Sequence, residues 1–278
     1  MKKDQSIESP KRGLKGIIRY IKRVYWRPEM NLLPGQLAFF IILSLVPLVT
    51  LVGYGASFLG LSIESITNIL NNLSPGISGM IEANGDSVGT SFLVFFGIML
   101  YIASNGLASI IVTSNTIYNI PQKPWLHRRI KGIFLTIFLV SLYLFVLLIP
   151  ALVYQLIAFV DAFNIRPILV NTITMLQVPI TWLIIFIFIK IIYTIAPDKR
   201  ISSKYMNLGA IFTTTGWVIT STFYGFWVRN FARHDLFYAG LANIAVLMLW
   251  IYFLSQIFVV GMSINYRTFE KSGNNWNK

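Results

Sequence analysis

Six long apolar runs constrain what this chain can fold into more than any other feature. A helix of about 20 residues crosses a hydrocarbon core of roughly 30 Å, and every run is longer than that. With 55% hydrophobic and 12% charged residues, the chain is too apolar for a disordered or an ordinary soluble protein. The sequence therefore predicts an all-α, polytopic membrane bundle with six transmembrane helices, at residues 37–59, 91–113, 133–160, 168–195, 207–228 and 240–264.

Basic residues alternate between rich and poor connections, and this pattern predicts the orientation. Of the 23 Lys and Arg residues, nine precede Gln36, four lie in 115–131, three in 196–206 and three in the C-terminal tail. Three more lie in the connections on the opposite side, and Lys190 lies within a run. Because Lys and Arg are retained in the cytoplasm during insertion, both termini are expected inside the cell. Insertion topology thus accounts for the net charge of +13, and no nucleic-acid partner is expected.

The same pattern divides the chain into three parts. Residues 1–36 form a basic cytoplasmic tail, 37–265 the membrane domain and 266–278 a second cytoplasmic tail. In the first tail, apolar residues recur at helical spacing and basic residues fill the other face, which predicts an amphipathic helix in the headgroup layer. This helix is either an anchor that orients the first span or a binding surface for anionic lipid headgroups. In the second case the expected headgroup contacts are Arg19, Arg23, Arg128 and Arg129.

Polar side chains within the apolar runs are candidates for a functional site, because such residues are costly to place in lipid. The candidates are Ser104, Asn105 and Ser109 in the second run, Lys190 in the fourth and Asn243 in the sixth. Hydrogen bonds between helices are one interpretation of the serines and asparagines, and a substrate site is the other. For Lys190 the alternatives are snorkelling of the ammonium to the interface and contact with a substrate anion or a transported proton.

Three prolines are expected to kink their helices, because proline removes a helical hydrogen bond and clashes with the preceding turn. They are Pro47, Pro150 and Pro179, in the first, third and fourth runs. Pro47 and Pro179 lie at a similar depth in their runs. Matched breaks of this kind are one feature of inverted-repeat transporters.

Signals for catalysis and for bound cofactors are missing from the sequence. The chain has no cysteine, which excludes disulfides and thiolate metal sites. Its two histidines, His127 and His234, fall on opposite sides of the expected membrane, so they cannot share a metal ion. No nucleophile elbow, phosphate-binding loop or zinc-protease motif occurs. We therefore expect a protein that is not an enzyme and that holds neither a metal nor a cofactor.

Three stretches of the chain carry a family resemblance. The first run contains QLAFFIILSLVP at 36–47, and Ser104, Gly106 and Leu107 precede a stretch that ends in LHRR at 126–129. The third stretch runs from NLGA at 207–210 through YAGL and LWIY to GMSIN at 261–265. Together they resemble the YihY/virulence factor BrkB family of bacterial inner-membrane proteins. The resemblance covers nearly the whole chain and implies six helices with cytoplasmic termini.

The chain departs from that family at one position. Many relatives have an acidic residue in the last motif, where this chain has Ser263. A role for that acid, such as proton coupling, therefore does not carry over. Family members have also borne a ribonuclease label, and the sequence offers neither the metal ligands nor the acid–base pair that such chemistry needs.

These observations predict a multi-pass protein of the bacterial cytoplasmic membrane. The kinked spans, the intramembrane asparagines and the basic inner rim favour a transporter or a flippase-type exporter of an amphiphilic or anionic substrate, with membrane lipids as partners. The alternative is a non-transporting membrane scaffold or envelope-assembly factor. The two differ in a polar cavity between the spans, which only transport requires.

Overall fold

Six long helices make up the part of the chain that the structure describes. The computed structural model describes residues 28–58, 90–160, 166–231 and 237–271, and these contain no strand. Each apolar run coincides with one helix, so the all-helical prediction is confirmed for these residues. The helices are α2 (Pro28–Phe58), α5 (Thr90–Ile117), α6 (Trp125–Val160), α7 (Arg166–Ile195), α8 (Asn207–Phe231) and α9 (Phe237–Lys271), with a short 3-10 helix η2 (Ser203–Met206) before α8.

Several helices extend past the apolar runs that predicted them. Helix α2 begins at Pro28, α6 begins at Trp125, and α9 continues to Lys271. The added turns of α6 and α9 carry basic residues, which the hydropathy pattern assigns to connections. Lys and Arg are good helix formers, so a helix continues into such a segment when tertiary contacts support it. The start of α6 is the extension that matters for the site below.

Three helices contain a described segment long and apolar enough to cross a membrane. These segments are Leu32–Gly53, Phe96–Ile117 and Ala242–Glu270, and Pro179–Ile195 is a shorter apolar helix. Large apolar side chains are exposed along these helices and on α8, for example Phe39 and Phe223. Extensive exposed apolar surface is typical of a face that contacts lipid. The full count of six crossings and the cytoplasmic termini stay predictions.

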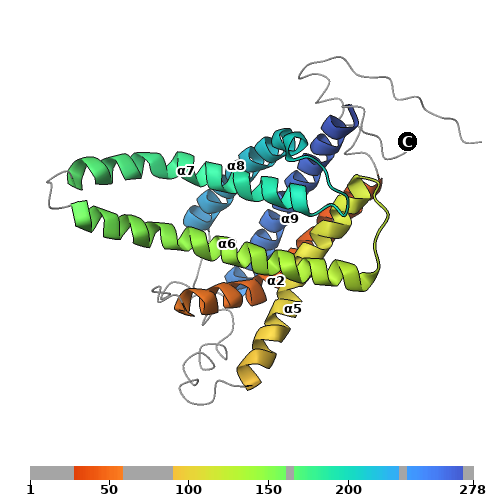
Figure 1. Ribbon diagram of the computed structural model, residues 1–278, viewed down its shortest axis with the longest axis horizontal. Helices are drawn as coiled ribbons and strands as arrows, with labels where there is room; N and C mark the ends of the chain where they lie inside the picture. Colours follow the sequence, from red (N-terminus) through yellow and green to blue (C-terminus); the bar gives the residue numbers. More distant parts are fainter. Residues whose placement is uncertain (1–27, 59–89, 161–165, 232–236, 272–278) are drawn as a thin grey trace, which may run out of the picture.

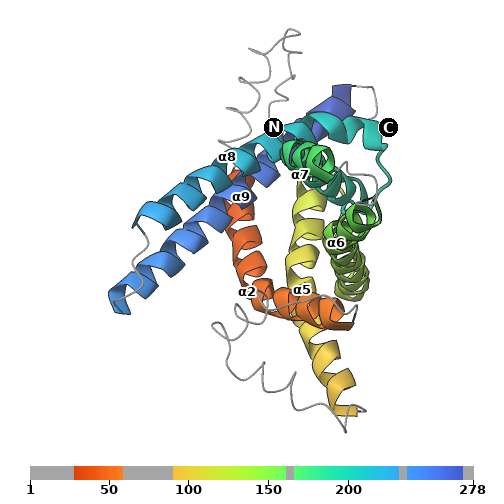
Figure 2. The same ribbon diagram turned by 90° about the vertical axis from the view of Figure 1, so that its left-hand side faces the viewer.

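The helices are arranged as three pairs that diverge from one end of the molecule (Figure 1). Helix α2 packs along α5, and α8 packs along α9. Helices α6 and α7 project together beyond the rest in Figure 1, and Figure 2 views them from that projecting end. Helix α5 also packs on α6, and α2 on α9, so the pairs are joined near their common end.

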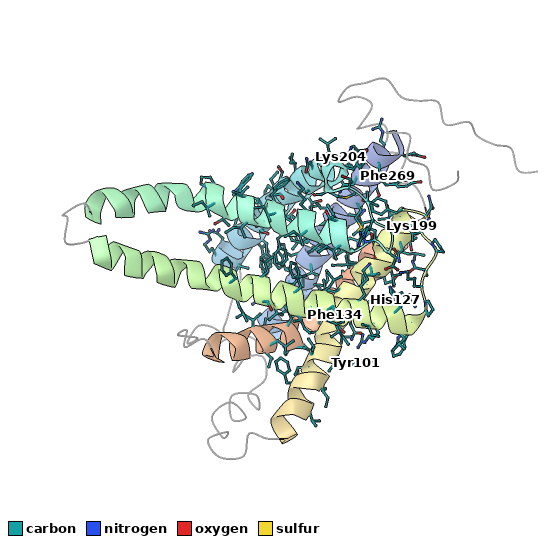
Figure 3. All side chains as sticks on the ribbon, viewed as in Figure 1. Tyr101, His127, Phe134, Lys199, Lys204 and Phe269 are labelled. Atoms are coloured by element: carbon teal, nitrogen blue, oxygen red, sulfur yellow. The ribbon has the colours of Figure 1, made fainter. Side chains whose placement is uncertain are left out.

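The buried core lies where α5, α7 and α9 end. Its largest fully buried apolar side chains include Ile111 and Tyr118 from α5 and the following turn, Ile189 and Tyr193 from α7, and Met262 from α9. Figure 3 places Lys199, Lys204 and Phe269 at this same end. Lys199 and Lys204 thus lie at the same end of the molecule as the buried core.

Two close helix crossings use residues from the family-like motifs. At the α2–α5 crossing, Ser44 Oγ accepts a hydrogen bond from the Gly106 amide at 2.8 Å and lies 3.4 Å from the Ile102 carbonyl oxygen. These are the two groups that bond to each other in a regular helix. The serine hydroxyl therefore enters the hydrogen-bond ladder of α5, an arrangement that bends helices.

The α8–α9 crossing depends on two glycines. A β-carbon at Gly209 would collide with the Gly261 carbonyl oxygen, and one at Gly261 would collide with Thr213 Oγ1 and the Tyr193 hydroxyl. Asn265 Oδ1 accepts a hydrogen bond from the Gly209 amide at 2.7 Å. Gly209 lies in the first turn of α8, where backbone amides have no partner within the helix, so Asn265 supplies the missing acceptor.

The predicted kinks concern prolines in α2, α6 and α7. Helix α2 contains Pro34 and Pro47, and Figure 2 shows this helix bending sharply along its length. Helix α7 contains Pro179, and α6 runs without a break through Pro150. Assignment of a kink to each proline stays a prediction. The amphipathic N-terminal helix with Arg19 and Arg23, the outer connection and the last tail residues lie outside the described residues.

Candidate functional site

Arg129 occupies the crossing of α5 and α6. Its Nη1 donates to Asn105 Oδ1 at 2.6 Å, and its Nη2 donates to the Tyr101 carbonyl oxygen at 2.6 Å. The guanidinium carbon lies 3.4 Å from the centroid of the Tyr101 ring, a cation–π contact. Figure 3 labels Tyr101 on α5, below the start of α6. We call Tyr101, Asn105 and Arg129 the crossing site.

The crossing site lies along a candidate membrane span. Tyr101 and Asn105 belong to the apolar segment Phe96–Ile117. At 1.5 Å per residue, about 18 Å of helix separates Asn105 from the end of α5. The sequence assigns Arg129 to a cytoplasmic connection, whereas the fold brings its guanidinium alongside the apolar part of α5. An ionisable group at such a position is a functional-site hypothesis by default.

Burial and charge make the crossing site unusual. Arg129 is only 7% exposed, and its Nε is buried with no hydrogen-bond partner in the described part of the chain. Within the described residues, no carboxylate lies within ion-pair distance of its guanidinium. A buried charge is stable only when it is paired or hydrogen-bonded. Two neutral oxygens accept hydrogen bonds from this cation, and its charge and the buried Nε–H are left to attract an anion.

Close packing holds α5 against α6 beside this site. A β-carbon added at Gly132 would lie 3.3 Å from the Ala108 β-carbon and 3.3 Å from the Ser104 carbonyl oxygen. The glycine therefore allows the two backbones to approach closely, one turn from Arg129. Ser104 is fully buried, and its hydroxyl donates to the Tyr101 carbonyl oxygen at 2.7 Å. The Tyr101 carbonyl thus accepts from both Ser104 and Arg129.

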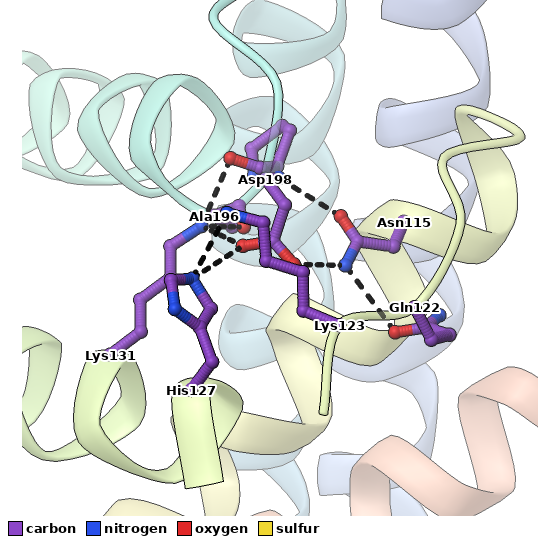
Figure 4. Close-up of polar contacts among 8 residues, drawn as sticks. Asn115, Gln122, Lys123, His127, Lys131, Ala196 and Asp198 are labelled. Atoms are coloured by element: carbon purple, nitrogen blue, oxygen red, sulfur yellow. Dashed lines mark hydrogen bonds and ion pairs between the residues drawn. The ribbon is translucent and has the colours of Figure 1, made fainter. Parts of the chain in front are cut away.

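A second polar cluster surrounds Asp198 in the connection between α7 and α8 (Figure 4). Asp198 Oδ1 accepts from Lys131 Nζ at 2.7 Å, and its Oδ2 accepts from Asn115 Nδ2 at 2.7 Å. The Asp198 amide donates to Asn115 Oδ1 at 2.9 Å. The Asp198 network, as we name it, consists of Asn115, Gln122, Lys123, His127, Lys131 and Asp198.

Lys131 also caps the C-terminal end of α7. Besides Asp198, its ammonium donates to the carbonyl oxygens of Ala196 at 2.8 Å and Pro197 at 3.0 Å. The last carbonyl groups of a helix lack partners within the helix and carry partial negative charge. Lys131 therefore neutralises both the end of α7 and the carboxylate that follows it.

The charge state of Asp198 follows from these contacts. Burial alone would raise the pKa of its carboxyl, because desolvation penalises the charged form. Hydrogen bonds from Lys131 and Asn115, with the charges of Lys131 and Lys123, outweigh burial and hold the pKa below its ordinary value of 3.8. Asp198 is therefore ionised at neutral pH, although its side chain is only 1% exposed.

The structure brings some of the predicted site residues together and leaves others apart. Ser104, Asn105 and Arg129 meet at the crossing site. Ser109 is buried on the same helix, and its hydroxyl has no hydrogen-bond partner within the described ranges. Lys190 lies on α7, partly exposed, with its ammonium 5.9 Å from the centroid of the Phe186 ring. Asn243 lies on α9, partly exposed, and belongs to neither cluster.

Two of the four arginines predicted to contact headgroups lie among the residues that the structure describes. Arg128 is partly buried, and its Nε is buried with no hydrogen-bond partner among those residues. Arg129 faces α5 as described above. Contact with lipid headgroups stays a prediction for both residues and for Arg19 and Arg23.

Sequence reasoning did not select the Asp198 network. Asp198 and Lys131 appear in the sequence as ordinary members of charged connections, and Asn115 lies just beyond the second apolar run. One signal was present: Asp198 is the single acid among the basic residues of the inner connections between the runs. Among the described residues, no group of three or more His, Cys, Asp or Glu side chains is placed to hold a metal ion.

Comparison with known proteins agrees with the fold. Helices long and apolar enough to cross a membrane, with apolar side chains exposed along them, define a helical membrane protein. The chain belongs to the virulence factor BrkB family, whose model matches residues 21–277. The resemblance seen in the sequence is thereby confirmed. No solved structure matches the chain.

Curated relatives span most of the chain. The ribonuclease-like protein YfkH of Bacillus subtilis is 29% identical over 83% of this chain and 87% of its own length. A UPF0761 membrane protein of Vibrio campbellii is 25% identical over 91% of this chain and 82% of its own length. Another, from Pseudoalteromonas translucida, is 26% identical over 87% of this chain and 82% of its own.

Proposed function

We propose that this protein moves an anionic amphiphile across the bacterial cytoplasmic membrane, as a flippase or exporter with six spans and cytoplasmic termini. The observation that carries the proposal is Arg129, a buried cation beside an apolar helix with no carboxylate partner among the described residues. Guanidinium groups bind phosphate and carboxylate through paired N–H donors. An amphiphile supplies such a headgroup together with chains that stay in the lipid.

The crossing site supplies exchangeable partners for this anion. Asn105 Oδ1 and the Tyr101 carbonyl oxygen are neutral acceptors, so each is weaker toward a cation than a charged headgroup oxygen. A headgroup that reaches Arg129 therefore replaces them without having to break an ion pair. The aromatic face of Tyr101 continues to stabilise the guanidinium while the partners exchange.

Reconstitution in liposomes tests this function. Purified full-length protein is placed in vesicles that contain a fluorescent anionic phospholipid, and dithionite quenching measures the fraction of label that changes leaflet. We expect faster exchange than in protein-free vesicles, and slower exchange with Arg129→Gln. Arg229→Gln is the matched control, because Arg229 is an exposed arginine at the far end of α8. Equal exchange with wild-type protein and with empty vesicles would remove the lipid substrate.

A non-transporting scaffold is the second candidate, and the packing of several polar groups favours it. Ser44 with Gly106, Asn265 with Gly209, and Tyr193 with Thr213 all use their polar atoms to join helices. A scaffold predicts that cellular function survives Asn105→Leu and Asn243→Leu, whereas transport through the crossing site predicts loss with Asn105→Leu. Complementation of a deletion strain separates the candidates when the variants are compared at equal amounts of folded protein in the membrane.

Ribonuclease activity, which the name of the Bacillus subtilis relative carries, is not part of this proposal. The described residues bring one imidazole near a carboxylate, with His127 Nε2 3.9 Å from Asp198 Oδ1. Both oxygens of Asp198 accept hydrogen bonds from Lys131 and Asn115. A carboxylate that is held and buried in this way is not available to transfer a proton to a substrate.

A further inference from the structure

The Asp198 network and the crossing site contact opposite sides of one helical segment. Successive residues of an α-helix are rotated by about 100°, so Arg129 points about 200° away from both His127 and Lys131. Lys131 binds the connection after α7, whereas Arg129 binds α5. The first turns of α6 therefore lie between two polar attachments that are only two residues apart.

We infer that Asp198 is a positioning residue for Arg129. The ion pair between Asp198 and Lys131 fixes the rotation of the first turns of α6, and this rotation directs Arg129 toward Tyr101 and Asn105. The inference rests on the proposed function in so far as Arg129 contacts the anionic substrate. It goes beyond that function because the orientation of Arg129 then depends on Asp198, a carboxylate in the connection between α7 and α8.

The geometry of the network suits this role. Asp198 is attached to α5 at two points, because Asn115 binds both its carboxylate and its backbone amide. Lys131 adds three donor contacts to the same connection. Elsewhere the described parts of α6 and α7 touch only sparsely. The network is therefore the main polar attachment between the start of α6 and the end of α7.

Separation of Lys131 from Asp198 has a defined consequence for the crossing site. The start of α6 would be held by its packing on α5, by the bonds from Lys131 to the Ala196 and Pro197 carbonyl oxygens, and by the two bonds of Arg129. Both bonds run to neutral oxygens, so they are weaker than the ion pair that was lost. The segment is then free to turn, and Arg129 leaves Asn105.

Cross-linking tests the positioning directly and without a transport assay. The chain contains no cysteine, so Ala108→Cys with Gly132→Cys introduces a single pair at the α5–α6 crossing. The β-carbons would be 3.3 Å apart, a few tenths of an ångström below the usual disulfide spacing. We expect rapid disulfide formation in membranes treated with a mild oxidant, and a rate about tenfold lower when Asp198→Asn is added.

Two further variants keep this test decisive. Lys131→Gln breaks the same ion pair from its other side and is expected to slow cross-linking as Asp198→Asn does. Glu270→Gln is the matched control, because Glu270 is the other acid whose side chain the structure describes, and it lies outside the network at the end of α9. Unchanged cross-linking in both Asp198→Asn and Lys131→Gln would overturn the inference.

Lipid exchange in the liposome assay provides the second readout. Asp198→Asn is expected to change the exchange rate of otherwise wild-type protein and to have no further effect in the Arg129→Gln background. A structural role that acts independently of Arg129 would change the rate by the same factor in both backgrounds, which would overturn the inference. If wild-type protein does not exchange lipid at all, the proposed function fails, and the cross-linking rates still decide whether Asp198 positions Arg129.

Discussion

The environment of Arg129 in the fold differs from the one that its position in the sequence predicts. In the sequence it is one of four basic residues in a connection. In the fold it is 7% exposed and bonded to Asn105 and to the Tyr101 carbonyl. Its partners lie on α5, and the residues next to Arg129 in the sequence do not predict this contact.

Loss of the Asn105 oxygen should destabilise the fold. Asn105→Leu leaves one N–H of a buried guanidinium without an acceptor, and we expect the free energy of unfolding to fall by about 1.5–3 kcal/mol. Denaturant unfolding of the detergent-solubilised protein, followed by tryptophan fluorescence, measures the change. Asn230→Leu makes the same replacement at an exposed position of α8 and should have little effect. Equal losses in the two variants would contradict the packing described for Arg129.

Asp198 should make the stability of the protein depend on pH in the acid range. Its pKa is lower in the folded protein than its ordinary value of 3.8, so the ionised form favours folding. This contribution is complete above about pH 5 and is lost as the pH falls through 3.8 toward the folded pKa. Melting temperatures of wild type and Asp198→Asn should therefore differ at pH 7, and the difference should shrink as the pH falls below 3.8. A difference that stays constant with pH would argue against an ionised Asp198 in the network.

At the scale of helices, the close packing of α8 on α9 depends on Gly209 and Gly261, which have no side chain. A methyl group at Gly261 collides with Thr213 Oγ1 and the Tyr193 hydroxyl. The hydroxyls of Tyr193 and Thr213 are 2.7 Å apart, and Tyr193 also donates to the Phe258 carbonyl oxygen. Any adjustment to the methyl group therefore disturbs buried hydrogen bonds as well as the packing of the two helices.

Gly261→Ala should destabilise this pair by about 1–3 kcal/mol, the range for overpacked cores. The matched substitution is Gly35→Ala in α2, where the added β-carbon meets no atom within 4 Å. Because alanine favours a helix more than glycine does, Gly35→Ala should be neutral or stabilising. Thermal unfolding in detergent compares the two variants, and equal melting temperatures would show that the crossing is more open than described.

At the scale of the whole molecule, the six-span topology is testable because the chain lacks cysteine. A cysteine at Gln122, which is exposed after α5, should react with a membrane-impermeant maleimide in inverted membrane vesicles and be protected in right-side-out vesicles. A cysteine at Ser87, before α5, should show the opposite pattern. Reaction of both positions from the same side would contradict an odd number of crossings between them.

The whole-molecule view also shows how much of the fold was predictable. All six helices were placed from hydropathy, because each must bury its backbone hydrogen bonds and present an apolar surface to lipid. The extension of α6 back to Trp125 was missed. Hydropathy indicates which residues enter lipid, whereas a helix continues as long as its backbone hydrogen bonds do. The added turns of α6 are supported by Arg129 and Lys131, whose partners lie on α5 and in the connection after α7.

The candidate site was only partly predictable for the same reason. Asn105 was selected because an amide in an apolar run is costly, and this cost can be read from one segment. Arg129 was selected as a headgroup contact from its position beside a span, without its partner. Asp198 was not selected, because a carboxylate in a basic connection is ordinary until its burial and its hydrogen bonds with Lys131 and Asn115 are known.

By itself, the sequence determined the class of this protein: a helical membrane protein of the BrkB family. Long apolar runs and lopsided charge are local properties, and lipid and the insertion process act on each segment separately. Only the tertiary structure decided that Arg129 lies against the apolar part of α5 and that Asp198 holds the start of α6. These contacts join residues from different helices, and the energy of a buried charge depends on which groups surround it and not on its place in the chain.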